Sequence, residues 1–308
     1  MNWIRLRIFL LALVAAFAGT LLPAEGIGQD KAPSAAKSAS QIDFQALLPR
    51  EAEYCRKLEA SILDFFCREE VEETIDITLE ANKPNAPINQ WTYFDLRTGQ
   101  TIFYQPGKVG KFKNTFVYDY QCIRRDRVIT ETRTLLKEGK EKRNEPNAQL
   151  KLSGFFYFNS LLSPVNLFGE SSQPDYDYQV VGRERFESRP VIVVEVKPKA
   201  GVVEPKCLSG KAWIEPGTAD ILKMELTQRP SGGLEVFAKR EAQYKRKLRL
   251  TLRTEFSAEK NGIRFPSRLL IEEAYLNDQG RAFVRSKTNI VYTNFKFFTV
   301  ATESRIIK

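Results

Sequence analysis

From Val71 onward, apolar and polar residues alternate in short runs that are separated by turn residues. Strict two-residue alternation is typical of half-buried β-strands, and the turns between these runs are short. Three such pairs of runs follow one another: Tyr176 to Phe186 with Pro190 to Lys197, Leu208 to Glu215 with Ile221 to Thr227, and Lys247 to Phe256 with Ser267 to Tyr275. Strands joined by tight turns pair with their chain neighbours, so the pattern predicts an antiparallel meander.

The same pattern predicts further strands: Val71 to Leu79, Tyr118 to Arg124, Val128 to Leu135 and Ala282 to Tyr292. Asn261-Gly262, in the loop between the last pair of runs, is a strong hairpin signal. The segment Lys137 to Gln149 is charged and without apolar periodicity, and we interpret it as a loop.

The segment Pro49 to Arg68 is predicted to be a helix. Its apolar side chains recur at three- and four-residue steps and form one stripe: Leu48, Ala52, Cys55, Leu58, Ile62 and Phe65. Pro49 suits the first helical turn, where its missing N–H costs nothing. A lone amphipathic helix needs a surface to pack on, which the following sheet supplies.

Between the two sets of strands, the segment Phe155 to Phe168 is strongly apolar but does not alternate, and Pro164 and Gly169 interrupt it. We expect one or two short helical turns that are buried. They either fill the core or form a lid over a hollow in the sheet.

The N-terminal residues predict export. Arg5 and Arg7 precede an uncharged apolar run of about 15 residues, shorter than the about 20 that span a bilayer. Small residues follow, so residues 1–26 are interpreted as a signal peptide cleaved after Gly26, with an uncleaved anchor as the alternative. No Cys for a lipid anchor lies near the cleavage site. Residues 27–41 are interpreted as a flexible linker and residues 42–308 as a single β domain, although length alone also permits two smaller ones.

The chain has four cysteines, at positions 55, 67, 122 and 207. On one helix Cys55 and Cys67 would be about 18 Å apart, too far for a disulfide. A bond between Cys67 and Cys122 is the favoured pairing, with buried free thiols as the alternative.

The absence of His excludes Ser-His-Asp and Cys-His catalysis and most zinc hydrolase sites. Neither a phosphate-binding loop nor a dinucleotide-binding glycine motif is present. We therefore expect no enzyme, no metal and no cofactor, with an enzyme that uses carboxylates or a Cys as the remaining alternative. The formal net charge of +9 favours acidic partners such as an anionic membrane surface or an envelope protein, and export argues against nucleic acid. The candidate docking residues are basic and lie on or beside one strand: Lys245, Lys247, Arg249 and Arg253.

The strands also predict an apolar sheet face. Val194 and Val196 share one face of their strand, and Ile214, Leu222, Met224 and Leu226 are expected to extend it, with Trp213 and Ile221 opposite. A curved sheet with an apolar inner face either packs a core or holds an apolar ligand.

Three stretches carry a family resemblance: Tyr178 to Glu184, Arg189 to Lys199 and Gly210 to Glu225, together with the closing segment Tyr292 to Phe298. In order, they show a strand ending in a Gly-containing turn, a strand closing on Lys-Pro, and a strand with Trp and an acidic residue that turns into one with Lys and Glu. This pattern resembles the periplasmic LolA-like proteins, the outer-membrane lipoprotein-sorting family.

The resemblance implies a mainly β fold, a strongly curved antiparallel half-barrel covered on its concave side by the N-terminal helix and a helical lid. It implies a non-enzymatic periplasmic carrier of a lipoprotein acyl chain or lipid in the Gram-negative cell envelope, soluble after cleavage. The alternative is a structural or interaction protein with a filled core. The ligand-lining residues would be Phe155, Phe156, Phe158, Leu161, Leu162, Val194, Val196, Ile214, Leu222 and Met224. The Arg that holds the lid in the archetypal carrier has no matched counterpart here.

Overall fold

A computed structural model describes residues 44–63, 65–81, 91–95, 100–104, 110–125, 128–150, 160–202, 208–228 and 235–297. All described elements belong to one compact unit, Ile42–Lys308. The predicted signal peptide and linker lie outside the described residues.

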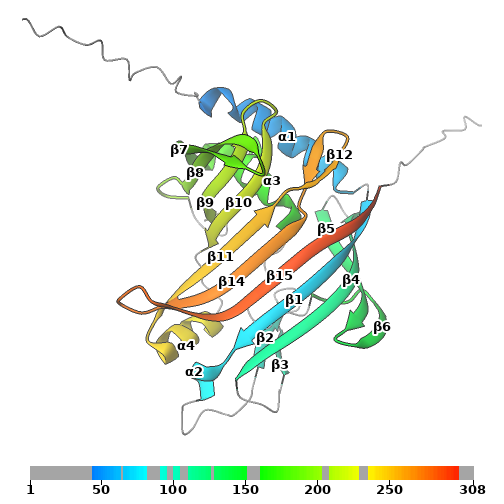
Figure 1. Ribbon diagram of the computed structural model, residues 1–308, viewed down its shortest axis with the longest axis vertical. Helices are drawn as coiled ribbons and strands as arrows, with labels where there is room; N and C mark the ends of the chain where they lie inside the picture. The colour runs from blue at the N-terminus through cyan, green and yellow to red at the C-terminus, as the bar shows by residue number, and fades with distance from the viewer. Residues whose placement is uncertain are drawn as a thin grey trace, which may run out of the picture. The chain divides into compact units, whose positions relative to one another are not determined.

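The main feature is one antiparallel sheet of 11 strands, which Figure 1 shows running diagonally across the molecule. The strand order is β6-β5-β4-β1-β15-β14-β11-β10-β9-β8-β7. The strands are β1 (Phe65–Asp76), β4 (Lys111–Arg125), β5 (Val128–Glu138), β6 (Glu141–Pro146), β7 (Tyr176–Phe186), β8 (Arg189–Pro198), β9 (Leu208–Glu215), β10 (Asp220–Gln228), β11 (Lys247–Glu255), β14 (Arg268–Leu276) and β15 (Ala282–Phe297). β6 and β7 stand at the two ends of the order, so the sheet is open rather than a closed barrel. The predicted mainly β, antiparallel fold is confirmed.

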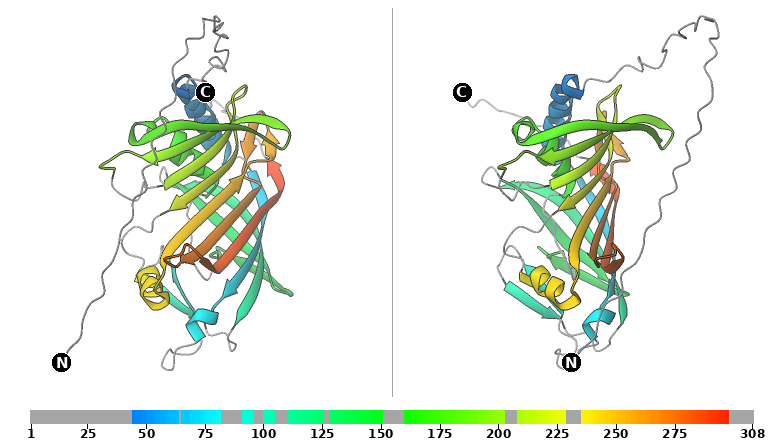
Figure 2. Two further views of the ribbon diagram at one scale, coloured as in Figure 1. Left: turned by 60° about the vertical axis from the view of Figure 1, so that its left-hand side comes forward. Right: turned by 90° about the vertical axis from the view of Figure 1, so that its left-hand side faces the viewer.

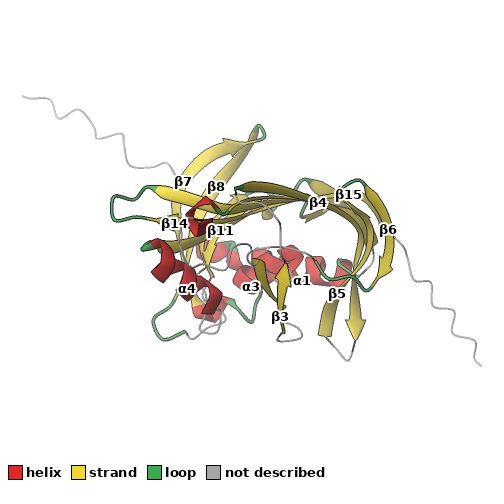
Figure 3. Cartoon of the chain, turned by 90° about the horizontal axis from the view of Figure 1, so that it is seen from below, coloured by secondary structure: helices red, strands yellow, loops and turns green. Residues whose placement is uncertain are grey.

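Helices lie on one side of this sheet. They are α1 (Leu48–Ser61) with the preceding turn η1 (Phe44–Ala46), α3 (Ser163–Phe168) with its flanking turns η2 (Ser160–Leu162) and η3 (Gln173–Asp175), and α4 (Glu235–Tyr244). Figure 3 shows the sheet curving around α1 and α3, while α4 covers another part of the same concave side. Figure 2 places α4 at the opposite end of the strands from α1. The short helix α2 (Thr78–Ala81) and two small hairpins, β2 (Trp91–Asp95) with β3 (Gln100–Tyr104) and β12 (Ala258–Lys260) with β13 (Ile263–Phe265), complete the fold.

The predicted meander is confirmed, because β7 to β11, β14 and β15 pair in chain order. The Asn261-Gly262 turn belongs to the inserted hairpin β12–β13, in which both residues have positive φ, of 54° and 71°. β11 still pairs with β14 across this insertion.

The loop predicted for Lys137 to Gln149 is wrong in part, because it contains the edge strand β6. All six residues of β6 are exposed, so no alternation of apolar and polar residues marks the strand. Gly139, with φ of 58°, makes the turn from β5.

The predicted helix is confirmed at its start but ends at Ser61, not at Arg68. From Phe65 onward every second residue is buried, so Phe65 and Cys67 lie on β1. The sequence interpretation placed the change from helical to two-residue period after Glu70, but the structure has it earlier, at Phe65. Helix α4 was not predicted.

Candidate ligand site on the concave face

The concave face of the sheet is lined with apolar side chains that belong to one large cluster together with α1 and α3. Most are fully buried. They include Val194 and Val196 of β8, Ala212 and Ile214 of β9, Ile221, Met224 and Leu226 of β10, Leu250 and Leu252 of β11, Leu269 and Ile271 of β14, and Ile290 of β15. This cluster, called the concave core below, is the surface on which an apolar ligand would lie.

The residues predicted to line a ligand fall into three groups. Phe155, Phe156 and Phe158 lie outside the described residues. Six belong to the concave core: Leu161, Leu162, Val194, Val196, Ile214 and Met224. Leu222 belongs to a small outer cluster with Val191, Val193 and Trp213, so its predicted position is wrong.

A register shift explains the error at Leu222. Ile221 pairs with Ile214, but Lys223 pairs with Trp213, so a bulge lies between them. A bulge adds one residue to a strand and breaks the strict alternation of faces. Ile221, which was expected on the outer face, therefore joins the concave core, and Leu222 turns outward.

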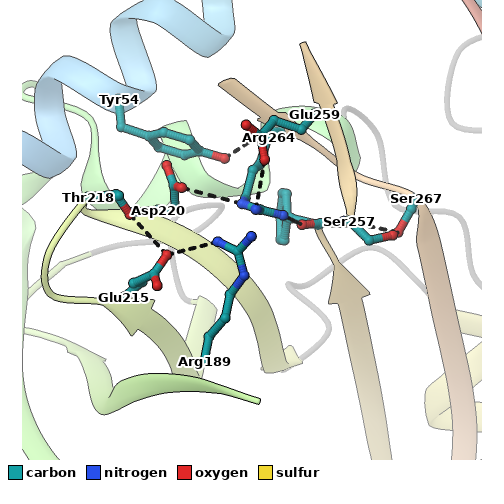
Figure 4. Close-up of polar contacts among 10 residues, drawn as sticks. Tyr54, Arg189, Glu215, Thr218, Asp220, Ser257, Glu259, Arg264 and Ser267 are labelled. Carbon is teal, nitrogen blue, oxygen red and sulfur yellow. Dashed lines mark hydrogen bonds and ion pairs between the residues drawn. The ribbon is translucent and has the colours of Figure 1, made fainter. Parts of the chain in front are cut away.

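Helix α1 covers one end of this face and is attached at its edges by polar contacts (Figure 4). The Tyr54 hydroxyl donates to the carbonyl oxygen of Arg264 at 2.9 Å. The Arg264 guanidinium is itself held by Asp220 at 3.3 Å and by Glu259 at 2.8 Å. Near the start of α1, Arg50 donates to the carbonyl oxygens of residues 216 and 217 in the β9–β10 turn, at 3.1 and 2.6 Å. The polar contacts fix the position of the helix, and its apolar stripe lies beneath.

Helix α3 is tied to the same region. Gln173 donates to the carbonyl oxygens of Leu48 and Phe168, both at 2.8 Å, and so links the two helices. Tyr178 of β7 donates to the carbonyl oxygen of Leu167 at 2.5 Å. The expectation of short buried helical turns is confirmed for residues 160–168, in which α3 buries Leu167 and Phe168.

A buried charge cluster holds α4 to the sheet. Arg240 of α4 contacts Glu273 of β14 at 3.0 Å, and Arg285 of β15 lies 3.4 Å from the same carboxylate. Tyr275 donates to Glu273 at 2.6 Å. Burial alone would raise the pKa of Glu273, but the two guanidiniums and this hydrogen bond hold it below its usual value.

A second buried cluster lies on β1, β4 and β5. Arg133 donates to both carboxylate oxygens of Glu69, at 2.6 and 3.0 Å, and to Glu131 at 3.1 Å. Tyr120 donates to Glu131 at 3.1 Å. Because cations and hydroxyls bind these buried carboxylates, the two clusters hold the strands and α4 in place.

The sequence interpretation missed both clusters, yet β1 carried a signal. Its buried positions run Phe65, Cys67, Glu69, Val71, Glu73, so two carboxylates occur in the apolar register. A charge in that register requires a buried partner.

The predicted Cys67–Cys122 disulfide is contradicted, because Cys55, Cys67 and Cys122 are free, buried thiols. Cys67 pairs with Tyr120 across β1 and β4, which places Cys122 two residues farther along. Such diagonal neighbours are about 7–8 Å apart, beyond the about 4.4–6.8 Å between Cα atoms that a disulfide requires. Burial raises the pKa of the Cys122 thiol to about 12, against the effect of its hydrogen bond with Tyr120. Cys207 lies outside the described residues.

The predicted basic docking residues divide into two kinds. Lys245 and Lys247 are exposed. Arg249 and Arg253 lie on the outer face of β11, where Glu272 and Glu225 pair with them at 3.1 and 2.8 Å. Cross-strand ion pairs therefore offset part of the positive charge that the sequence concentrates there.

One charged residue of the apolar stripe of α1 has no such partner. Glu51 is fully buried, and neither of its carboxylate oxygens has a hydrogen-bond partner in the part of the chain that the structure describes. The Ser163 hydroxyl, at the start of α3, is likewise buried and unpartnered. Sequence reasoning assigned Glu51 no place in the stripe, although the positions 48, 51, 55, 58 and 62 have regular three- and four-residue spacing.

Within the described residues, no helix has the length and apolar character needed to cross a membrane.

Solved structures with a similar fold include LolA-like proteins, the family that the sequence resembles. A DUF1329 family protein from Desulfovibrio piger is 13% identical with a TM-score of 0.32, over 83% of this chain and 95% of that one. A LolA superfamily protein from Nitrosomonas europaea is 11% identical with a TM-score of 0.29, over 81% and 94%. A domain from Vibrio parahaemolyticus, assigned as an outer membrane lipoprotein-sorting protein, is 14% identical with a TM-score of 0.30, over 83% and 95%.

At these identities and TM-scores the likeness carries no argument about what this chain does. No family model matches the chain, and no curated protein matches it.

Proposed function

We propose that this chain is a non-enzymatic carrier or binding protein for an apolar ligand, a lipoprotein acyl chain or a lipid, in the periplasm. The observation that carries the proposal is the concave core. Successive strands from β8 to β15 present apolar side chains to one curved face, and helices cover that face.

The covering helices suit a closed state that opens. α1 is attached through Arg50 and Tyr54, whose partners lie in turns and in the hairpin β12–β13 rather than on the concave strands. An acyl chain that lies beside α1 and α3 on this face is removed from water, and each buried CH₂ contributes about 0.8 kcal/mol.

A second candidate follows from the full burial of the concave side chains. A core already filled by protein leaves no room for a ligand, and the chain would then be a structural or interaction protein of the cell envelope. Its exposed Lys245 and Lys247 would take part in docking to an anionic partner.

Native mass spectrometry of the chain from Ile27, purified after export, tests the first candidate. We expect a stoichiometric lipid that is released by extraction, and uptake of a fluorescent fatty acid by the emptied protein. A clean apo mass that stays unchanged after incubation with lipids would contradict the carrier function.

Ala212→Phe separates the two candidates further. Ala212 is a small, fully buried residue of the concave face. In a face with room for a ligand, the Phe ring occupies that room and blocks uptake at little cost in stability, whereas in a filled core it overpacks by about 1–3 kcal/mol. Lys211→Phe, on the outer face of the same strand, is the matched control, because Lys211 is exposed and should affect neither property.

A further inference from the structure

Glu51 is an exception among the buried charges of the described residues. It lies on the core-facing stripe of α1, between Leu48 and Cys55, and its exposed fraction is 0%. The carboxylates of Glu69 and Glu273 are equally buried, but each is bound by an arginine. Both oxygens of Glu51 lack a partner, a deficit that costs about 1–3 kcal/mol.

The neighbouring charges do not relieve this deficit. Arg50 is turned to the β9–β10 turn carbonyls, and Asp220 of β10 is paired with Arg264. Burial is the largest cause that raises the pKa of Glu51 well above its usual value; Arg50 opposes the rise and the negative charge of Asp220 adds to it. A carboxyl group that stays protonated offers one O–H donor and free acceptor positions.

A second unpartnered group lies in the same helical layer. Ser163 begins α3, which packs on α1, and its hydroxyl is buried without a partner. Two hydrogen-bonding groups are thus left unsatisfied where the two helices cover the concave core. Buried polar groups are otherwise nearly always satisfied.

We propose that Glu51 and Ser163 form a head-group site, which takes the uncharged, hydroxyl-bearing end of an amphiphile whose acyl chain lies along the concave core. This inference rests on the proposed carrier function and specifies its ligand. Hydroxyls of the head group donate to and accept from the carboxyl group and the serine hydroxyl, and they satisfy both. An anionic head group is disfavoured, because the negative charge of Asp220 acts on this place, where it helps to raise the pKa of Glu51, and would repel a second anion.

Three probes with the same lauroyl chain test the site. They are 1-monolauroylglycerol, which is uncharged and has hydroxyls; laurate, which is anionic; and methyl laurate, which is uncharged and has no hydroxyl. Each displaces a fluorescent acyl probe from the mature chain at pH 7.5. We expect monolauroylglycerol to bind about tenfold more tightly than laurate or methyl laurate, the factor that corresponds to about 1.4 kcal/mol.

Glu51→Leu should abolish this preference but keep the binding of methyl laurate, since the chain-binding face is unchanged. Glu51→Gln keeps hydrogen-bonding capacity and should retain most of the preference. Glu59→Leu is the matched control, because Glu59 is an exposed residue of the same helix. Thermal melts confirm that each variant is folded, and the affinity ratio is a readout that a stability change alone does not move.

Equal affinity of the wild-type chain for the three probes, or a preference that survives Glu51→Leu, would overturn the head-group site while the carrier function stands. Failure of all three probes to bind the wild-type chain would overturn both.

Discussion

The unpartnered carboxyl group of Glu51 makes a strong prediction about stability. Replacing it with glutamine removes the titration and keeps the shape, so Glu51→Gln should unfold at higher denaturant concentration near neutral pH. The gain arises because the unfolded wild-type chain ionises Glu51 in water with a pKa of about 4.3, whereas burial raises the pKa of the folded state well above that value.

The sign follows from proton binding. Between the two pKa values the folded state binds more protons than the unfolded state, so the wild-type free energy of unfolding decreases as pH increases. The stability that the protonated carboxyl permits is fully present below the unfolded pKa and is lost as pH rises through the folded pKa. Each unit of separation between the two pKa values amounts to about 1.36 kcal/mol.

We therefore expect Glu51→Gln and wild type to unfold with similar free energies at pH 4, and to diverge as pH rises. Near pH 7.5 the variant should be the more stable, by about 1.36 kcal/mol for each unit of pH between the unfolded pKa and either the folded pKa or pH 7.5, whichever is lower. In a chain of this size each kcal/mol corresponds to about 2–4 °C in Tm. Urea unfolding followed by circular dichroism, at intervals from pH 4 to pH 8, measures the difference.

Glu53→Gln is the control on the same helix. The side chain of Glu53 is 40% exposed, and its pKa is lowered, first by a hydrogen bond from Arg56. Its replacement should produce no divergence of the kind expected for Glu51. If wild type and Glu51→Gln give parallel curves of unfolding free energy against pH, the carboxyl group has a partner or water access, and the reasoning about its burial is refuted.

Three further predictions concern other parts of the fold. Arg240→Met removes a buried partner of Glu273 and should cost about 3 kcal/mol, with faster hydrogen exchange in α4; unchanged exchange would show that the pair does not hold the helix. Gly210→Ala should destabilise by more than about 1 kcal/mol, because a Cβ would lie 2.1 Å from the Glu225 carbonyl oxygen, whereas Gly217→Ala, with nothing within 4 Å, should be tolerated in the same melts. In a Cys207→Ser background at pH 8, the three buried thiols should react with a thiol reagent only after unfolding, since burial raises their pKa values; rapid labelling of the native chain would contradict their placement.

The sequence was sufficient for the meander because its evidence is local. In β14 the apolar alternation and the adjoining turn residues lie within one hairpin, and a pairing partner is the next strand, β15. β6 lacked this evidence, because a fully exposed edge strand has no buried face to produce alternation. Helix α4 is short and is held by Arg240, whose partner Glu273 lies 33 residues away in the sequence, a contact that no local pattern displays.

Face assignments were less secure than strand assignments, and the two errors have different causes. Leu222 was misplaced because a bulge inverts the faces for part of a strand, and the bulge is visible only when β9 and β10 are paired. Cys67 was assigned to the helix because the helical spacing of α1 was extended beyond Ser61. Phe65 fits both the helical spacing and the two-residue alternation of β1, so the sequence alone did not show where the helix ends. In each case the tertiary pairing, not the local propensity, decided the outcome.

The omission of Glu51 from the buried stripe of α1 has a different cause. Its spacing placed it in the stripe, but a charged residue is not expected to be buried there. The other buried carboxylates show how the fold accommodates such a charge: Glu69 has Arg133, and Glu273 has Arg240 and Arg285. Among the described residues no equivalent cation binds Glu51, although Arg50 is its chain neighbour and is directed elsewhere. A leucine at this position would satisfy packing without the cost, so stability does not explain the residue. Local rules that are broken without compensation inside the fold concentrate at functional sites, and a carboxyl group that stability disfavours is most simply explained by the ligand group that completes its hydrogen bonds.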